Sequence, residues 1–331
     1  MGRLGALLAL LALVAGCAPG AEPAGSASPG AALARPAAVP PLAGRWRILA
    51  GDVRDTQWYG HLSDVIGVAL DQDGNLYATG SRNGNVQVVT PDGRLIARWA
   101  GLGGGFGQLD GPSGLAVDDE GHVYVADTLN HRVQVFDPTG RPLITWGQFG
   151  RGPGELAFPY GVALAPDGSV YVSDTRNDRI QLFAIDGHPL DRWGSRGDGP
   201  GQLDRPYGIA VARDGTLYVV EELNNRVQHF SATGQPLGVW GEYGTAPGQF
   251  NYPRGIALDA GGNVYVADSW NHRIQKFTPE GHLLEILGTQ GAGVGQLQRP
   301  EGLVVDRHGD LYVADSGNSR LQKLALASPA P

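Results

Sequence analysis

The sequence is poor in cysteine and in basic residues. Its single cysteine, Cys17, has no partner for a disulfide or for a metal site built from several thiolates, and no cysteine beyond position 17 is present to act as a nucleophile. Lysine and arginine total 25 against 33 aspartates and glutamates, which gives a net charge of −8. A nucleic-acid ligand requires basic side chains clustered on one face, so we expect no nucleic acid among the partners.

Signals for catalysis are also absent from the sequence. No Gly-x-Ser-x-Gly segment, which would mark a hydrolase nucleophile, occurs. The glycine-rich run at 101–107 resembles a nucleotide-binding loop, but it follows a strand pattern and no helix pattern comes after it. We therefore predict no catalytic residue, no cofactor and no bound metal.

Glycine, in contrast, is abundant, and its spacing is the strongest signal in the chain. Among 52 glycines, six stand 47 residues apart: Gly67, Gly114, Gly161, Gly208, Gly255 and Gly302. A fixed period of this length indicates a repeat architecture. Each repeat contains four short runs rich in Val, Ile, Leu, Tyr or Phe, bounded by turn residues, which predicts four antiparallel strands that we name a to d. Further glycines recur between a and b and between c and d, where turns need a positive φ.

Four-stranded units repeated radially form a β-propeller. Five copies are complete, and the sixth, which starts at Gly302, supplies strands a to c and then stops. Residues 44–51 have the character of strand d, so we expect them to pair with 320–326 and close a six-bladed ring without an exposed edge. The predicted fold class is all-β, with one propeller domain at 44–326 that acts as a monomer.

The repeats also predict how the blades pack. Strand a should be innermost because its third residue is small in five copies: Ala69, Ala116, Ala163, Ala210 and Ala257. The recurring tyrosine of strand b and tryptophan of strand d are expected to fill the space between sheets.

The N-terminus has the pattern of a bacterial export signal. Arg3 precedes an apolar stretch at 4–14 that is too short to span a bilayer, and Leu-Val-Ala-Gly then leads to Cys17. This resembles the lipobox, in which the cysteine is lipidated. We expect a signal peptide at 1–17, an Ala/Pro/Gly/Ser-rich disordered tether at 18–43 and a short tail at 327–331. The alternative is an ordinary secretory signal. Either way the protein belongs on the extracytoplasmic side, and the lipidated form is anchored in the cell envelope.

The repeat core carries the motif Asp-x-x-Asn-x-Arg, as in VADTLNHRVQVF (125–136), VSDTRNDRIQLF (172–183) and VADSWNHRIQKF (266–277). These segments resemble the NHL repeat over about residues 44–326. Two copies depart from the pattern: blade one reads TGSRNGN (79–85), and blade four has Glu221 in place of the aspartate. The resemblance implies a binding scaffold. Some NHL relatives bind RNA, some are sensor domains of receptor kinases, and a distant group are metal-dependent lyases.

The motif itself is best explained by structure. Asp and Asn can satisfy backbone groups of the b–c loop, and Arg can donate to carbonyls of a neighbouring strand. A catalytic site needs asymmetry, whereas this motif recurs in nearly every blade.

The asymmetric residues lie on one face. The b–c and d–a loops leave the same side of a four-stranded blade, which we call the b–c face. Two series vary there: Ile66, Ser113, Tyr160, Tyr207, Arg254 and Glu301 before each repeat glycine, and Arg82, Leu129, Arg176, Glu222, Trp270 and Gly317 in the b–c loops. Aromatic and arginine side chains favour protein or glycan contacts. From these series we predict a ligand site made of Tyr160, Tyr207, Arg254, Trp270, Arg176, Glu222 and Glu301.

Three functions remain open from sequence. The first is a membrane-tethered scaffold for a protein, peptide or glycan. The second is a metal-dependent lyase or a lactonase-type enzyme that uses the axial channel, although only Glu301 supplies an acid to the axial series, and His131 and His272 stand three repeats apart on opposite blades. The third is a purely structural envelope protein.

We expect Cys17→Ala to abolish membrane attachment, because the lipobox cysteine would carry the acyl chains that anchor the protein. Carbonate-washed membrane fractions report the result. A Cys17→Ala protein that stays in the pellet would show that the lipobox interpretation is wrong.

Overall fold

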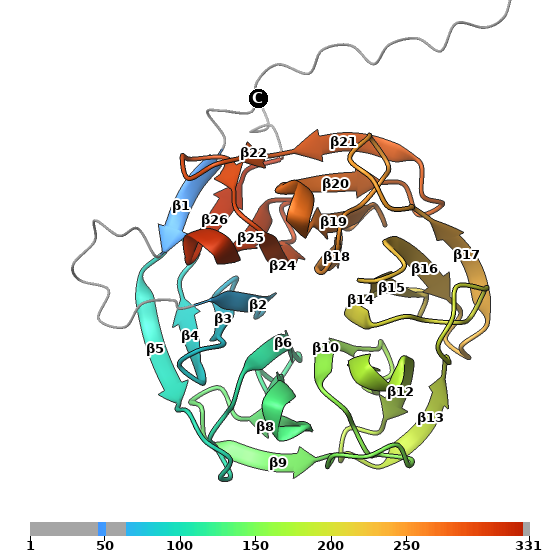
Figure 1. Ribbon diagram of the computed structural model, residues 1–331. Coiled ribbons are helices and arrows are strands. Elements are labelled where there is room, and N and C mark those ends of the chain that lie inside the picture. The colour runs from blue at the N-terminus through green and yellow to red at the C-terminus, as the bar shows by residue number, and fades with distance from the viewer. Residues whose placement is uncertain (1–45, 51–63, 327–331) are drawn as a thin grey trace, which may run out of the picture. The chain divides into compact units, whose positions relative to one another are not determined.

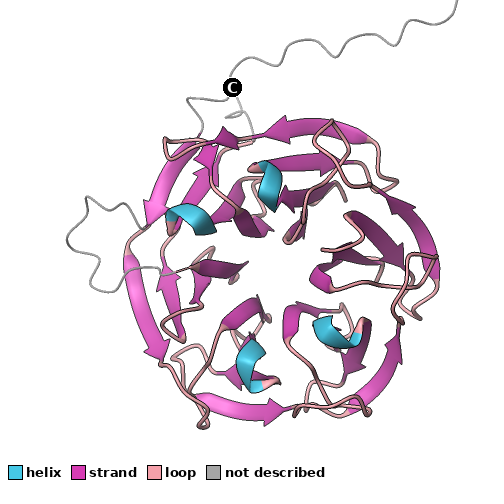
Figure 2. Ribbon diagram, viewed as in Figure 1, coloured by secondary structure: helices cyan, strands magenta, loops and turns pink. Residues whose placement is uncertain are grey.

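The computed structural model describes residues 46–50 and 64–326. They form six four-stranded antiparallel sheets in a ring, which confirms the predicted six-bladed β-propeller (Figure 1). The helical elements within these residues are single 3-10 turns in the b–c loops (Figure 2): η2 (Thr128–Asn130), η3 (Thr175–Asn177), η4 (Ser269–Asn271) and η5 (Ser316–Asn318).

Strands a to d of each blade follow one another from the axis outward. Blade one contains β2 (Val65–Leu70), β3 (Leu76–Gly80), β4 (Asn85–Val89) and β5 (Leu95–Ala100). Blade two contains β6 (Pro112–Val117), β7 (Val123–Asp127), β8 (Arg132–Phe136) and β9 (Pro142–Trp146). Blade three contains β10 (Pro159–Leu164), β11 (Val170–Asp174), β12 (Arg179–Phe183) and β13 (Pro189–Trp193).

The second half repeats the plan. Blade four contains β14 (Pro206–Val211), β15 (Leu217–Glu221), β16 (Arg226–Phe230) and β17 (Pro236–Trp240). Blade five contains β18 (Ile256–Leu258), β19 (Val264–Asp268), β20 (Arg273–Phe277) and β21 (Leu283–Leu287). Blade six contains β24 (Pro300–Val305), β25 (Leu311–Asp315), β26 (Arg320–Leu324) and β1 (Trp46–Ala50). A short pair, β22 (Thr289–Gln290) with β23 (Gln296–Leu297), lies in the loop between blades five and six.

Ring closure occurs as the sequence predicts. Strand β1 pairs antiparallel with β26, and Trp46 lies opposite Leu324. The buried Leu49 and Ala50 of β1 then pack with Val65 and Leu76 of blade one, so the N-terminal strand completes both blade six and its contact with blade one. No open sheet edge is left at β26.

The hydrophobic core consists of six clusters, each built from two neighbouring blades. The strand b tyrosines are buried within them, at 1% to 5% exposure. Strand d tryptophans pack against the c–d turn of the next blade, where a Cβ on Gly187 would lie 2.8 Å from the Trp146 ring. Glycine at this turn therefore serves two purposes, since it supplies the positive φ of 87° and leaves room for the indole.

The first strands approach most closely at the repeat glycines. Gly208 donates its N–H to the carbonyl of Arg254 at 2.9 Å, and a Cβ on Gly255 would collide with the carbonyl oxygen of Glu301. Strand a is innermost, as expected, but the expected reason is wrong. The alanines, such as Ala69, pack into the clusters between blades. The absence of a Cβ at the repeat glycines is what permits the close approach.

The predicted signal peptide at 1–17 with Cys17, the tether at 18–43 and the tail at 327–331 lie outside the described residues. Within residues 46–50 and 64–326, no helix has the length and hydropathy needed to cross a membrane.

Deleting residues 44–51 should lower the free energy of unfolding by at least about 3 kcal/mol, because it removes the buried Trp46 and Leu49 side chains, each worth about 1.5–3 kcal/mol, and opens the edge of β26. Thermal unfolding measures the effect. Arg47→Ala, which changes an exposed side chain of the same strand, is the control and should stay within about 0.5 kcal/mol of the parent. An unchanged melting temperature after the deletion would contradict the closure.

Candidate functional site

Two cavities lie on the propeller axis. The narrower, about 110 Å³, is lined by the repeat glycines of all six blades. The wider, about 240 Å³, is lined by b–c loop residues and by residues that precede the repeat glycines. We call them the channel and the mouth cavity. Ile66, Tyr160, Arg254 and Glu301 line both cavities and therefore lie between them. In Figure 1 the innermost strands β2, β6, β10, β14, β18 and β24 surround this axis.

Arg254 joins two carboxylates that come from different blades. Its Nη1 donates to Oε1 of Glu301 at 2.6 Å, while its Nε and Nη2 donate to Oε1 of Glu222 at 3.1 and 2.9 Å. Tyr160, in β10 of blade three, donates its hydroxyl to the second carboxylate oxygen of Glu301, in β24 of blade six. These two blades are opposite in the ring, so the polar network crosses the axis. We call Tyr160, Glu222, Arg254 and Glu301 the axial network.

The two carboxylates of the axial network are buried, while Arg254 and Tyr160 are partly exposed. Glu222 is 3% exposed and Glu301 is 5% exposed. Burial alone would lower the pKa of the Arg254 guanidinium, but Glu301, helped by Tyr160, Tyr207 and Glu222, raises that pKa above its ordinary value. Burial, and next the Glu301 carboxylate, raises the pKa of Tyr160. Arg254 is therefore charged and Tyr160 protonated at neutral pH.

Tyr207 lies beside the axial network. Its ring centroid is 4.2 Å from that of Tyr160, and the Arg254 guanidinium lies 5.3 Å from the centre of the Tyr207 ring. Burial, followed by the charge of Glu222, raises the pKa of Tyr207 to about 12. The hydroxyl is thus a hydrogen-bond donor at neutral pH.

The structure places Tyr160, Tyr207, Arg254 and Glu301 near the axis on the b–c face, where they line the mouth cavity. The contacts that join Tyr160 and Arg254 to Glu301 go beyond what the sequence predicted. Removing Arg254 alone would leave Glu301 buried without a cation and Glu222 with only Arg205, at 3.4 Å, which is costly. We therefore expect the fold to depend on Arg254.

The predicted b–c series contains an error of one position, because Glu222 is not equivalent to the other members of the series. Counting 47 residues from Arg176 reaches Leu223, and Glu222 corresponds to Thr128, Thr175 and Ser269. Those hydroxyls donate to the carbonyls of Pro159, Pro206 and Pro300, each at 2.7 Å. In blade four the carboxylate of Glu222 instead reaches Arg254 and, at 3.4 Å, Arg205.

The remaining two predicted residues lie apart from the axial network. Arg176, in η3, is exposed and lines the mouth cavity, with its guanidinium 4.6 Å from the centre of the Phe158 ring. Trp270, in η4, is 50% exposed and pairs with the Tyr252 ring at 5.8 Å. Trp270 lines neither axial cavity, so the structure does not bring it together with the other six.

Sequence reasoning missed Arg205, which lines the mouth cavity and contacts Glu222. A signal for it was present in a third series at the same period: Asp64, Gly111, Phe158, Arg205, Tyr252 and Arg299. All six have a positive φ between 46° and 56°. Because the backbone is uniform while the side chains vary, this position is free to serve a ligand.

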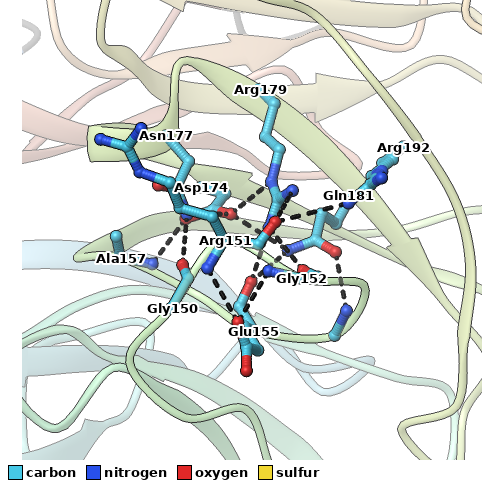
Figure 3. A network of polar contacts seen from close by, with 11 residues as sticks. Gly150, Arg151, Gly152, Glu155, Ala157, Asp174, Asn177, Arg179, Gln181 and Arg192 are labelled. Carbon is cyan, nitrogen blue, oxygen red and sulfur yellow. Dashed lines mark hydrogen bonds and ion pairs between the residues drawn. The ribbon is translucent and has the colours of Figure 1, made fainter.

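The repeated Asp-x-x-Asn-x-Arg motif binds the loop that connects consecutive blades (Figure 3). In blade three, Asp174 is fully buried and accepts hydrogen bonds from the Ala157 N–H at 2.6 Å and from Arg179 Nε at 2.7 Å. Asn177 donates to the Gly150 carbonyl, and Arg179 donates to the carbonyls of Arg151, Gly152 and Glu155. The motif is structural, as predicted, but its arginine binds carbonyls of the d–a loop and not those of a neighbouring strand.

Blade four preserves this arrangement despite its substitution. Glu221 accepts from the Asp204 N–H at 3.0 Å and from Arg226 Nε at 2.6 Å, as the aspartates do elsewhere. In blade one, Gly80 and Asn85 replace the acid and the arginine.

The two histidines of the b–c loops have separate structural roles. His131 Nδ1 accepts from the Phe158 N–H at 3.2 Å, and His272 Nδ1 accepts from the Arg299 N–H at 3.0 Å. Across residues 46–50 and 64–326, no group of three or more His, Cys, Asp or Glu side chains is arranged to hold a metal ion.

The fold and the axial cavities define the chain as a six-bladed β-propeller with a polar network across its channel. A family model for the NHL repeat matches residues 109–136, 156–183, 250–277 and 297–324. The protein thus contains NHL repeats, and they form blades of the propeller. The unmatched blades, one and four, are those whose motif departs from the pattern.

Solved structures with the same fold include enzymes. A streptogramin B lyase is 17% identical, with 84% of this chain and 96% of that chain covered and a TM-score of 0.60. A gluconolactonase from Xanthomonas campestris is 18% identical, with 81% and 89% covered and a TM-score of 0.61. A putative gluconolactonase is 19% identical, with 85% and 91% covered and a TM-score of 0.62. At these identities the likeness shows the fold alone. No curated protein matches the sequence.

Arg254→Ala should destabilise the propeller by about 3–5 kcal/mol, because it leaves the buried Glu222 and Glu301 without their shared cation. Urea unfolding provides the measurement. The triple variant Glu222→Gln/Arg254→Gln/Glu301→Gln should recover much of this loss by removing the unpaired charges, and Arg176→Ala should stay within about 0.5 kcal/mol of the parent. A parental unfolding curve for Arg254→Ala would mean that the ion pairs do not contribute to stability.

Proposed function

We propose that this protein is a membrane-tethered scaffold that binds a protein, peptide or glycan on the b–c face. The observation that carries the proposal is the mouth cavity. Tyr160, Tyr207, Arg176, Arg254 and Glu301, all selected because they break the repeat pattern, line this one cavity. Aromatic and arginine side chains around a partly enclosed site are the groups that dominate binding energy at protein interfaces.

The location of the scaffold rests on the N-terminal pattern. A lipidated Cys17 would hold the propeller on the extracytoplasmic side of a bacterial membrane, and residues 18–43 would provide the reach to a partner in the envelope. This part of the proposal is independent of the mouth cavity and is tested by the Cys17→Ala variant.

An enzyme is the second candidate, and one feature favours it. The axial network places buried ionisable groups, Tyr160, Arg254 and Glu301, between two cavities, and such groups gather at catalytic sites. Structures of similar fold include a lyase and a gluconolactonase. A metal-dependent lyase or lactonase-type activity would use this channel. Stoichiometric metal in the purified protein, together with turnover of a lactone that is lost in Tyr160→Phe, would favour the enzyme over the scaffold.

The scaffold is tested by capture from native envelope extracts with the parent and with Arg176→Ala/Trp270→Ala. These side chains are exposed and lie outside the axial network, so the double variant should keep its melting curve. Loss of a hot-spot contact worth about 2 kcal/mol would weaken capture about thirtyfold. The matched control, Ile185→Ala/Arg213→Ala, changes exposed residues of the turns on the opposite face and should capture the partner normally. Equal capture by all three proteins would place the binding surface elsewhere.

A further inference from the structure

The carboxylates at the mouth cavity already accept hydrogen bonds within the protein, whereas several donors there remain available to a ligand. Glu301 accepts from Arg254 and Tyr160, and Glu222 accepts from Arg254 and Arg205. Both carboxylates are buried, so neither is available to a ligand. A ligand that offered only hydrogen-bond donors would find no anionic partner at the floor of the cavity.

Three side chains at the cavity have N–H or O–H groups that can donate further hydrogen bonds. Arg205 is 40% exposed at its side chain and, within residues 64–326, its guanidinium makes one ion pair, to Glu222 at 3.4 Å. Arg176 lies with its guanidinium 4.6 Å from the centre of the Phe158 ring and lines the cavity, and within residues 64–326 its guanidinium makes no ion pair. The Tyr207 hydroxyl is the third donor. These groups surround a space in which an oxygen acceptor can be held by several hydrogen bonds at once.

The local charge favours an anion despite the acidity of the whole chain. Three arginines (176, 205 and 254) and one glutamate (301) line the cavity, which gives its lining a charge of 3 − 1 = +2. Two carboxylates adjoin this lining: Glu222 contacts Arg254, and Asp178 accepts a hydrogen bond from the Arg205 N–H. The two positive groups that are not committed to the axial network, Arg176 and Arg205, are the more exposed ones. Carboxylates form strong charge-assisted hydrogen bonds with arginine.

The shape and lining favour a peptide over a glycan. Sugars stack on open aromatic faces, but Tyr160 and Tyr207 pack on each other, Arg254 lies over Tyr207, and Arg176 lies over Phe158. The remaining apolar contribution is aliphatic, from Ile66 and from Leu129, which is 50% exposed. At about 240 Å³ the cavity is smaller than the roughly 300–1,000 Å³ typical of small-molecule pockets, so it suits one side chain of a longer segment.

We propose that the mouth cavity binds an acidic peptide segment: the carboxylate of an Asp or Glu accepts hydrogen bonds from Arg176, Arg205 and Tyr207, and an adjacent apolar residue packs on Leu129. This inference rests on the proposed scaffold function and gives its ligand a chemical class. The fold does not demand the two arginines, because other residues occupy their positions in other blades. Leu129 and Trp270 are equivalent to Arg176, and Phe158 and Tyr252 are equivalent to Arg205.

The test is selection of short random peptides, with blocked ends, on the purified full-length protein. The expected result is enrichment of Asp or Glu next to an apolar residue. A synthetic copy of the selected peptide with Gln in place of Glu should bind at least about tenfold more weakly, as expected for loss of charge-assisted hydrogen bonds. Arg176→Gln/Arg205→Gln should show the same loss, and Arg176→Glu/Arg205→Glu should select Lys- or Arg-containing peptides instead. The control Arg213→Gln/Arg307→Gln, exposed on the opposite face, should bind like the parent.

Thermal unfolding must accompany each variant, because Arg205 contacts Glu222. If the double variant unfolds early, Arg176→Gln alone decides, since the Arg176 guanidinium lies over the Phe158 ring and forms no ion pair with any residue that the structure describes, so its substitution does not unpair a buried charge there. Two results would overturn the inference without contradicting the proposed scaffold function. The first is that the selected peptides show no enrichment of Asp or Glu. The second is that the parent and Arg176→Glu/Arg205→Glu bind the selected peptides equally. Binding of uronic-acid oligosaccharides without peptide selection would overturn it in favour of a glycan. Equal envelope capture by the parent and by Arg176→Ala/Trp270→Ala would instead contradict the b–c face as the binding surface, and the absence of any captured partner would contradict the scaffold itself.

Discussion

The structure depends on the backbone contact of six strands around one axis. At the repeat glycines the neighbouring chains are so close that a Cβ would collide with a carbonyl oxygen, as at Gly255 and Glu301. This constraint requires glycine at the same position of all six blades. On the b–c side, the residue before each glycine lines the axis next. Tyr160, Arg254 and Glu301 occupy that position and close the channel with a network of hydrogen bonds and ion pairs.

A second set of interactions holds the b–c face in shape. The buried aspartates of the repeat, or Glu221 in blade four, bind the arginine that reaches the carbonyls of the d–a loop. The connecting loops before blades two to six are thereby tied to the blade that follows each of them. Loops held in this way can present variable side chains in fixed positions, which reduces the entropy lost when a ligand binds. The repeated motif supports function indirectly, through the rigidity of the face.

The same axial network accommodates either proposed activity. Its buried carboxylates and arginine stabilise the ring, and its upper surface forms the floor of the mouth cavity. For a scaffold, this floor excludes water and leaves Arg176, Arg205 and Tyr207 as donors to a ligand. For an enzyme, the network itself would have to open or exchange protons. The ion pairs of Arg254 with two glutamates oppose such opening, because each separation would expose a buried charge.

The 47-residue period determined the fold by itself. It predicted the number of blades, the turn glycines and the pairing of 44–51 with 320–326. Strand spacing and turn residues are local properties, so they can be read directly from the sequence. The sequence also predicted five residues of the mouth cavity, since they break an otherwise regular pattern. It could not determine their partners. Tyr160 and Glu301 are 141 residues apart and meet only because blades three and six face each other across the axis. The role of Glu222 and the presence of Arg205 were likewise decided by the tertiary structure, which alone brings a b–c loop, a d–a loop and the axial residues together.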